Sequence, residues 1–92
     1  MQLTLASRLV AAPSVVTRDV GGDLMLLDLD SGTYFGLDPV GSEIWQAAED
    51  DLSLGEMCDR LQPRYDVSRQ QLEQDVLALA EQLVAQRLAA PR

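Results

Sequence analysis

Residues 30–39 decide the fold, and they read Asp-Ser-Gly-Thr-Tyr-Phe-Gly-Leu-Asp-Pro. The first three are turn formers, since short polar side chains bond nearby backbone groups and Gly tolerates positive φ. Residues 33–37 contain β-branched and aromatic side chains, which favour a strand. Asp38 then supplies a helix N-cap, and Pro39 occupies the first helical position. The stretch therefore predicts a turn, a strand and a helix start in direct succession.

Two further strands are predicted before this one. Residues 14–18 are rich in β-branched side chains, and residues 24–28 form a second apolar run. Residues 21–23 between them read Gly-Gly-Asp, a hairpin signal, because Gly tolerates the positive φ that such turns need. Short turns between successive strands predict an antiparallel meander. In that order the strand 33–37 lies at an edge of the sheet.

Three helices are predicted after the sheet. Their start signals are Asp38 before Pro39, the capping box Ser53–Glu56 and a second capping box, Ser68–Gln71. The first helix presents Val40, Ile44, Trp45 and Ala48 on one face and ends in the acidic turn 49–51. Pro63 limits the second helix. The third is the longest, and its apolar stripe is read as running from Leu72 through Leu88.

This order predicts an α+β fold of the winged-helix type, with a three-stranded antiparallel sheet followed by three helices. A chain of 92 residues is one domain at most, here placed at residues 13–90. Residues 1–12 are expected to form an N-terminal arm or a short strand.

Composition excludes several classes of function. Fifteen acidic residues against seven basic ones, all Arg, give a net charge of −8, which repels nucleic acid and anionic lipid. The chain has no His and a single Cys, so the commonest general base and metal ligand are missing. We expect no enzyme activity, no metal and no cofactor. No apolar run approaches a membrane helix and no signal peptide is read, which predicts a cytoplasmic protein.

Single residues each have a structural interpretation. Cys58 is predicted to be a small core residue. Asp28 and Asp30 are read as turn formers, with a hard-cation site as the weaker alternative. Trp45 is read as a core anchor, the alternative being that its edge lines a peptide groove. Tyr34 and its neighbour on the strand must point to opposite faces, which leaves one aromatic side chain as a candidate binding contact.

The predicted edge strand is the best candidate for a binding element. An edge presents unpaired N–H and C=O groups that an extended peptide can pair with. Residues 33–37 contain neither charge nor Pro, the usual guards against such pairing. A long amphipathic helix beside the edge would supply an apolar wall and complete a groove.

Residues 30–45 resemble the PqqD-like family, whose pattern is a turn, an aromatic strand, Leu, Asn or Asp, Gly and then Ile-Trp. Residues 54–83 resemble that family's second and third helices. The resemblance as a whole covers about residues 13–88. Members are peptide chaperones, also called RiPP recognition elements, and bind the leader segment of a ribosomally made precursor peptide. The resemblance implies that the leader adds as a strand and packs against the third helix. The implied site residues are Thr33, Tyr34, Phe35, Gly36 and Leu37 on the strand, and Leu72, Asp75, Val76 and Leu79 on the helix. Some of the four helix residues must face the core.

The implied partners are a precursor leader peptide and a leader peptidase or other modifying enzyme, without nucleic acid or membrane. The aromatic strand and Ile-Trp favour the leader-binding protein of lasso-peptide pathways. The first alternative is the chaperone of the pyrroloquinoline quinone pathway, whose partner is a radical enzyme. The second is a winged-helix DNA-binding regulator, which needs a basic recognition helix, whereas the third helix is acidic.

Overall fold

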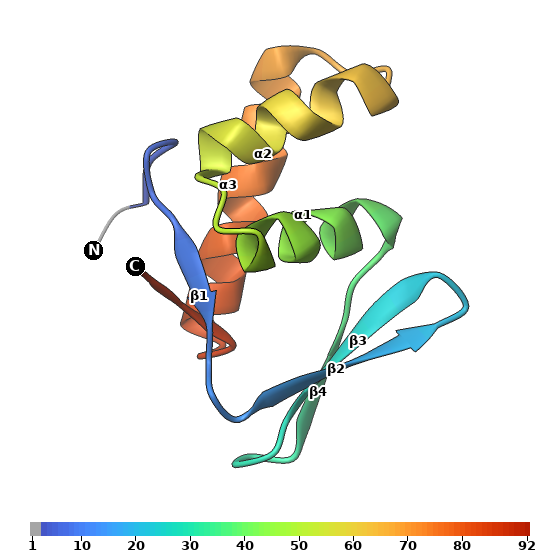
Figure 1. Cartoon of the computed structure of the whole chain (residues 1–92), viewed down its shortest axis with the longest axis vertical. Helices are drawn as coiled ribbons and strands as arrows, with labels where there is room; N and C mark the ends of the chain where they lie inside the picture. The colour runs from blue at the N-terminus through green and yellow to red at the C-terminus, as the bar shows by residue number, and fades with distance from the viewer. Residues whose placement is uncertain (1–2) are drawn as a thin grey trace.

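Five strands and three α-helices make up residues 3–92, the part of the chain that the computed structural model describes (Figure 1). In chain order they are β1 (Leu9–Ala11), β2 (Val15–Val20), β3 (Asp23–Asp28), β4 (Thr33–Gly36), α1 (Pro39–Glu49), α2 (Leu54–Leu61), the short 3-10 helix η1 (Gln62–Arg64), α3 (Arg69–Ala85) and β5 (Ala89–Pro91). Residues 1 and 2, within the predicted N-terminal arm, lie outside the described residues.

The main sheet has the order β2-β3-β4 with both pairs antiparallel, which confirms the predicted meander and places β4 at an edge. Gly21 and Gly22 have φ of 64° and 97° and form the β2–β3 turn as expected. Leu26, at the centre of β3, is fully buried and anchors the inner face of the sheet to the core. The helices lie on this inner side only, so the predicted α+β fold class is confirmed.

The predicted caps fix where the helices begin. The Asp38 side chain accepts a hydrogen bond from the Gly41 N–H at 2.7 Å, and both halves of the Ser53 capping box are present. The second predicted capping box forms only in part. Ser68 accepts from the backbone N–H of Gln71 at 3.1 Å, but the Gln71 side-chain amide donates to Asp75 at 2.8 Å instead. An i,i+4 partner on the helix thus competes with the cap for that amide.

The core lies where the three helices meet the inner face of the sheet. Trp45 is 2% exposed and Cys58 is fully buried, which confirms the interpretation of both as core residues. The other large, fully buried side chains are Leu9, Leu26, Leu54, Met57, Leu61, Leu72, Leu83, Leu88 and Val76. Side chains from β1, β3 and all three helices therefore share one hydrophobic cluster.

The two ends of the chain form a second small sheet that was not predicted. β1 pairs antiparallel with β5, in the register Leu9 opposite Pro91. The expectation that the third helix continues through Leu88 is wrong, because α3 ends at Ala85 and Arg87 has a φ of 60°. This reversal lets the Leu88 N–H bond the Leu83 carbonyl at 2.9 Å, and it buries Leu88 under the strand pair. β1 lies within the segment expected to be an arm or a short strand.

Among residues 3–92, no helix combines the length and apolar character needed to span a lipid bilayer.

Candidate functional site

β4 offers a free edge whose hydrogen-bonding groups can be assigned from the register. The Leu37 N–H donates to the Leu24 carbonyl at 2.8 Å, and Phe35 lies opposite Leu26. Residues of an antiparallel pair alternate between bonding the partner strand and pointing away from it. Tyr34 and Gly36 therefore aim their N–H and C=O groups away from β3. These two residues form the open edge of the sheet.

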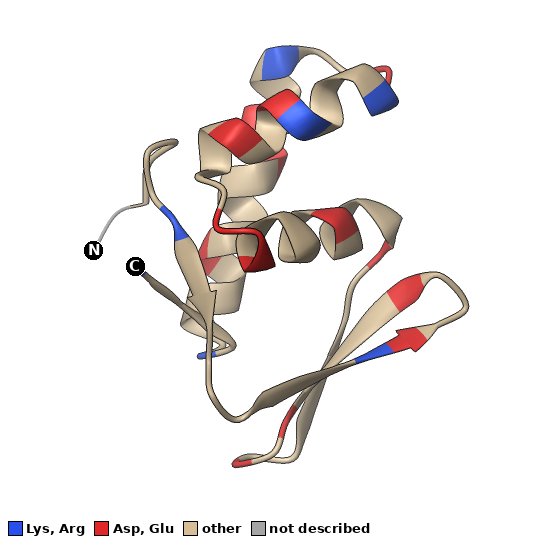
Figure 2. Ribbon diagram, viewed as in Figure 1, with Lys and Arg blue, Asp and Glu red and all other residues tan. Residues whose placement is uncertain are grey.

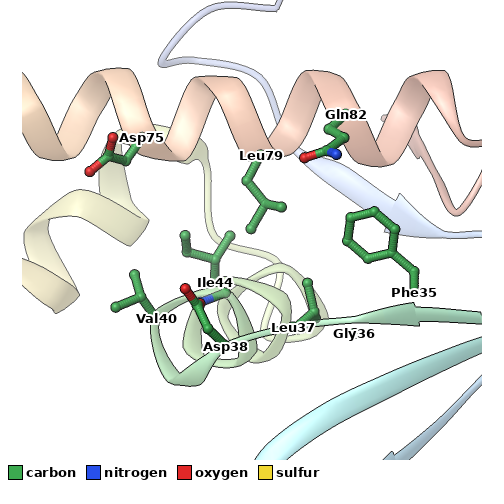
Figure 3. Close-up of a pocket in the computed structure, with 10 residues that line it drawn as sticks. Phe35, Gly36, Leu37, Asp38, Val40, Ile44, Asp75, Leu79 and Gln82 are labelled. Atoms are coloured by element: carbon green, nitrogen blue, oxygen red, sulfur yellow. The ribbon is translucent and has the colours of Figure 1, made fainter.

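A groove of about 510 Å³ runs beside this edge, between β4, the first turns of α1 and one side of α3 (Figure 3). Its lining residues are Phe35, Gly36, Leu37, Asp38, Val40, Gly41, Ile44, Asp75, Leu79 and Gln82. Figure 3 shows Leu79 reaching down from α3 toward Ile44, with Phe35 at one end of the groove. Strand, helix start and long helix thus form the three sides of one open channel.

The inner part of the groove is apolar and is fixed by the core. Leu37 and Ile44 are 4% and 2% exposed, while Leu79 and Phe35 are half-buried and contact the same cluster. Ser42 ties α1 to the sheet, because its hydroxyl accepts from the Leu24 N–H at 2.9 Å. The channel therefore has rigid apolar walls, and its polar groups lie at the rim.

Five of the nine residues implied by the family resemblance line this groove: Phe35, Gly36, Leu37, Asp75 and Leu79. Leu72 and Val76 are 2% and 0% exposed and face the core, and neither lines the channel. Thr33 and Tyr34 are exposed on β4 and do not line it. Tyr34 projects from the outer face of the sheet, while Phe35 projects inward, as their positions on one strand require.

Five lining residues were not among the implied site residues: Asp38, Val40, Gly41, Ile44 and Gln82. Signals for them exist. The Asp-Pro helix start places the first turn of α1 directly after the edge strand, so its residues must border the edge. Gln82 follows Asp75 and Leu79 at the i, i+4, i+7 spacing of a single helix face. Trp45 does not line the groove, so the alternative reading of its edge as a groove contact is wrong.

One end of the groove carries negative charge. Asp38 and Asp75 are exposed, and each uses Oδ1 to accept a hydrogen bond, from Gly41 N–H and from the Gln71 amide respectively. Their Oδ2 atoms accept no hydrogen bond from the described residues. Nearby, the pKa of the Tyr65 hydroxyl is raised, chiefly by its hydrogen bond to Glu43, and the charge of Asp38 adds to that rise.

The outer face of the sheet is uncovered and apolar. The register aligns Val16, Leu27 and Tyr34 in a row across the three strands, and Val16 and Tyr34 are 45% and 67% exposed. Arg18 and Met25 lie in the next row, so the face forms a shallow hollow of about 320 Å³. Tyr34 belongs both to this face and to the open edge.

Two residues considered for chemistry have structural roles. The Asp28 carboxylate accepts hydrogen bonds from Ser14 Oγ at 2.7 Å, Asp30 N–H at 3.1 Å and Ser31 Oγ at 3.0 Å, which confirms it as a turn former. Burial raises the pKa of the Cys58 thiol, which disfavours the reactive thiolate. Within residues 3–92, no group of three or more acidic or Cys side chains is arranged to hold a metal ion.

Comparisons with known proteins agree with this geometry. The family model for coenzyme PQQ synthesis protein D (PqqD) matches residues 23–89. The solved structure of TbiB1 in complex with the TbiA(beta) leader peptide is 34% identical, covers 86% of this chain and 92% of its own, and superposes with a TM-score of 0.81. The structure of lasso peptide synthetase B1 complexed with the leader peptide is 27% identical, with coverages of 91% and 99% and a TM-score of 0.86. No curated protein matches the chain in sequence.

Proposed function

The chain belongs to the PqqD family, and on that basis we propose that it binds the leader segment of a ribosomally made precursor peptide as an added strand beside β4. The observation that carries this proposal is the open edge at Tyr34 and Gly36 beside a groove walled by α3. Main-chain hydrogen bonds to the edge supply affinity, and alternate peptide side chains in the groove supply specificity. The chain acts by binding and performs no chemistry on the peptide.

Each implied residue takes a place in this proposal. Residues 33–37 provide the pairing strand, and Phe35 and Leu79 provide the apolar contacts of the groove. Asp75 lines the same groove at its rim. Leu72 and Val76 hold α3 against the core and so position the wall without touching the peptide.

A lasso-peptide pathway is the favoured setting, because both similar solved structures are leader-peptide complexes and one of them is of a lasso peptide synthetase B1. The pyrroloquinoline-quinone-type chaperone is the alternative within the family. A DNA-binding role is disfavoured, because α3 carries Glu73, Asp75 and Glu81 against the single Arg69. Figure 2 shows the basic residues scattered over several elements, without a continuous basic face in this view.

A modifying enzyme or leader peptidase is the proposed second partner, and the outer face of the sheet is its proposed docking surface. The apolar row Val16, Leu27 and Tyr34 continues to the edge where the peptide strand adds. A partner docked there contacts the chain and its bound peptide together. Exchange of Tyr34 for Ser should then leave the peptide Kd within about twofold, since Tyr34 lies outside the groove, while slowing cleavage by the cognate peptidase.

The proposal is tested by removing one hydrogen-bond donor from the edge. Gly36 is suited to this, because its N–H points away from β3 without a partner among residues 3–92, and an added Cβ meets only Met25 Cε, at 3.9 Å. Peptides of about 12 residues, selected by display on the immobilised protein, serve as probes, since an extended peptide of that length exceeds β4 at both ends.

Gly36→Pro should abolish binding of the selected peptides, while Gly36→Ala, which keeps the N–H, should bind within about threefold of the parent. Circular dichroism of both variants checks that they are folded. Equal affinity of the folded Pro and Ala variants would remove the edge-strand proposal.

A further inference from the structure

The two ends of the groove differ in chemical character. Figure 3 shows Val40 and Asp75 at one end, Phe35 and Gln82 at the other, and Leu79 above Ile44 between them, with Asp38 just below Ile44 on the Val40 side. The middle is apolar and half-buried or buried, whereas both carboxylates are exposed at the rim. A peptide lying in the channel therefore meets an apolar stretch and then an acidic one.

Neither carboxylate, that of Asp38 or that of Asp75, forms an ion pair with another residue of the range 3–92. Arg64, beside Tyr65 near this end, forms its ion pair with Glu43 at 2.5 Å. On α3 itself, Arg69 pairs with Glu73 and Asp59 on another side of the helix. The acidic end thus faces the open channel without a cation of its own.

The fold does not require these two charges. Asp38 serves as an N-cap through one oxygen, and Asn caps a helix equally well. Asp75 bonds the Gln71 amide through one oxygen, which an Asn carbonyl can replace. The charge of both residues is therefore free to act on a ligand, and the two residues lie on different elements that converge on one channel.

We propose that the bound leader carries a Lys or Arg whose side chain lies between Asp38 and Asp75, two positions away from an apolar residue packed on Leu79. This inference rests on the proposed function, since it takes the peptide to be an added strand. Side chains on one face of a strand recur every second residue, about 6.6 Å apart. Successive inward side chains therefore reach first the apolar middle and then the acidic end. A basic head group gains two carboxylates there, and its methylene stem packs along Val40.

The test compares peptide pools selected by display on two forms of the full chain. Random peptides of about 12 residues are selected in parallel on the parent and on the Asp38→Asn/Asp75→Asn double variant. The parent pool should show one enriched Lys or Arg position, two residues from an enriched apolar position. The double variant should retain the apolar position and lose the basic one, because only the charge has been removed.

Affinity measurements on one selected peptide give the size of the effect. Each single Asp→Asn change should raise its Kd about threefold and the double change about tenfold, as expected for partly exposed ion pairs. The matched control is Glu81→Gln with Glu49→Gln, which removes the same net charge at exposed positions outside the groove. The control should leave the Kd within about twofold, so a general effect of net charge is separated from a local one.

Two results overturn the inference alone. One is a parent pool without basic enrichment whose peptides still lose binding in Gly36→Pro. The other is basic enrichment that survives unchanged in the double variant. Selected peptides that bind Gly36→Pro as tightly as the parent would instead overturn the proposed function, and the inference with it.

Discussion

The two edges of the main sheet make an instructive pair. β2 and β4 each have one side unpaired, yet their surroundings differ. The Leu29 N–H bonds the Ser14 carbonyl at 2.9 Å, which fixes the alternation along β2. Thr17 and Asp19 therefore point their backbone N–H and C=O groups away from β3. Adjacent Arg18 and Asp19 place charge on this strand. β4 carries no charge, and the backbone groups that point away from β3 belong to Tyr34 and Gly36.

The second difference lies beside the edges. β4 continues directly into α1 and is flanked by α3, so its edge opens on a groove lined by Leu79. The groove residues include none from β2. A free edge alone is thus only a row of donors and acceptors. An edge together with a side-chain wall can bind one peptide and reject others.

The largest expected effect comes from placing Pro at equivalent positions on the two edges. Gly36 on β4 and Thr17 on β2 both point their N–H groups away from β3, so neither substitution removes a bond of the sheet. Gly36→Pro should weaken binding of a selected peptide more than ~100-fold, whereas Thr17→Pro should change it less than ~2-fold. Fluorescence anisotropy titrations of the labelled peptide measure both. Weakening by Thr17→Pro and not by Gly36→Pro would mean that the peptide binds at the β2 edge, contrary to the proposal.

A smaller effect is expected from a substitution in α3, the helix that forms one wall of the groove. Leu79→Ala removes an apolar groove contact and should raise the peptide Kd about tenfold, since burying a Leu side chain contributes ~1.5–3 kcal/mol. Val84→Ala is the matched control, because Val84 is a half-buried apolar residue of the same helix that lies outside the groove. Isothermal titration calorimetry gives the Kd values, and thermal melts check folding. Equal weakening by both variants would mean that α3 acts only through stability.

The smallest effect concerns Asp28, which joins the start of β2 to the turn before β4. Hydrogen bonds from Ser14 and from the Asp30 N–H lower the pKa of this carboxyl below its ordinary value of 3.8. A lowered folded-state pKa stabilises the protein above the ordinary value, and this contribution is lost as pH falls through the folded-state pKa. Asp28→Asn should therefore lower Tm by a few degrees near neutral pH.

The Tm difference between parent and Asp28→Asn should shrink as the pH is lowered toward about 2. Asp30→Asn is the control, because its exposed carboxylate accepts no hydrogen bond from the described residues. Scanning calorimetry at a series of pH values provides the comparison. A Tm difference for Asp28→Asn that stays constant with pH would contradict the assigned role of its charge.

Local signals allowed most of the fold to be predicted. Turns at Gly21-Gly22, the Asp38 cap and the Ser53 capping box depend on neighbours within a few residues, and all form as expected. The β1–β5 pair depends on residues about 80 positions apart, and three-residue strands carry too little pattern to reveal it. The position of Leu88 could not be predicted from local sequence either, since its apolar character fits a helix face and a buried turn equally well.

The candidate site was predictable at the strand and less so at the helix. An edge strand without charge stands out in the sequence, whereas α3 is apolar over a broad stripe. At ~100° per residue, Val76 lies ~100° around the helix from Asp75, and Leu72 lies only ~20° from Leu79. Packing of the whole core decides which side faces β4. The same holds for Ile44 and Gln82: their spacing assigns each to a helix face, but only the tertiary packing turns that face toward β4.

Amide hydrogen exchange measured by NMR, with and without a selected peptide, tests the edge-strand account most directly. Strand addition at β4 predicts that the Tyr34 and Gly36 amides become protected by peptide, because their N–H groups gain partners. The Thr17 and Asp19 amides on β2 should exchange at unchanged rates in the same sample. Saturating peptide that leaves Tyr34 and Gly36 unprotected, or protects Thr17 and Asp19 instead, would contradict the account.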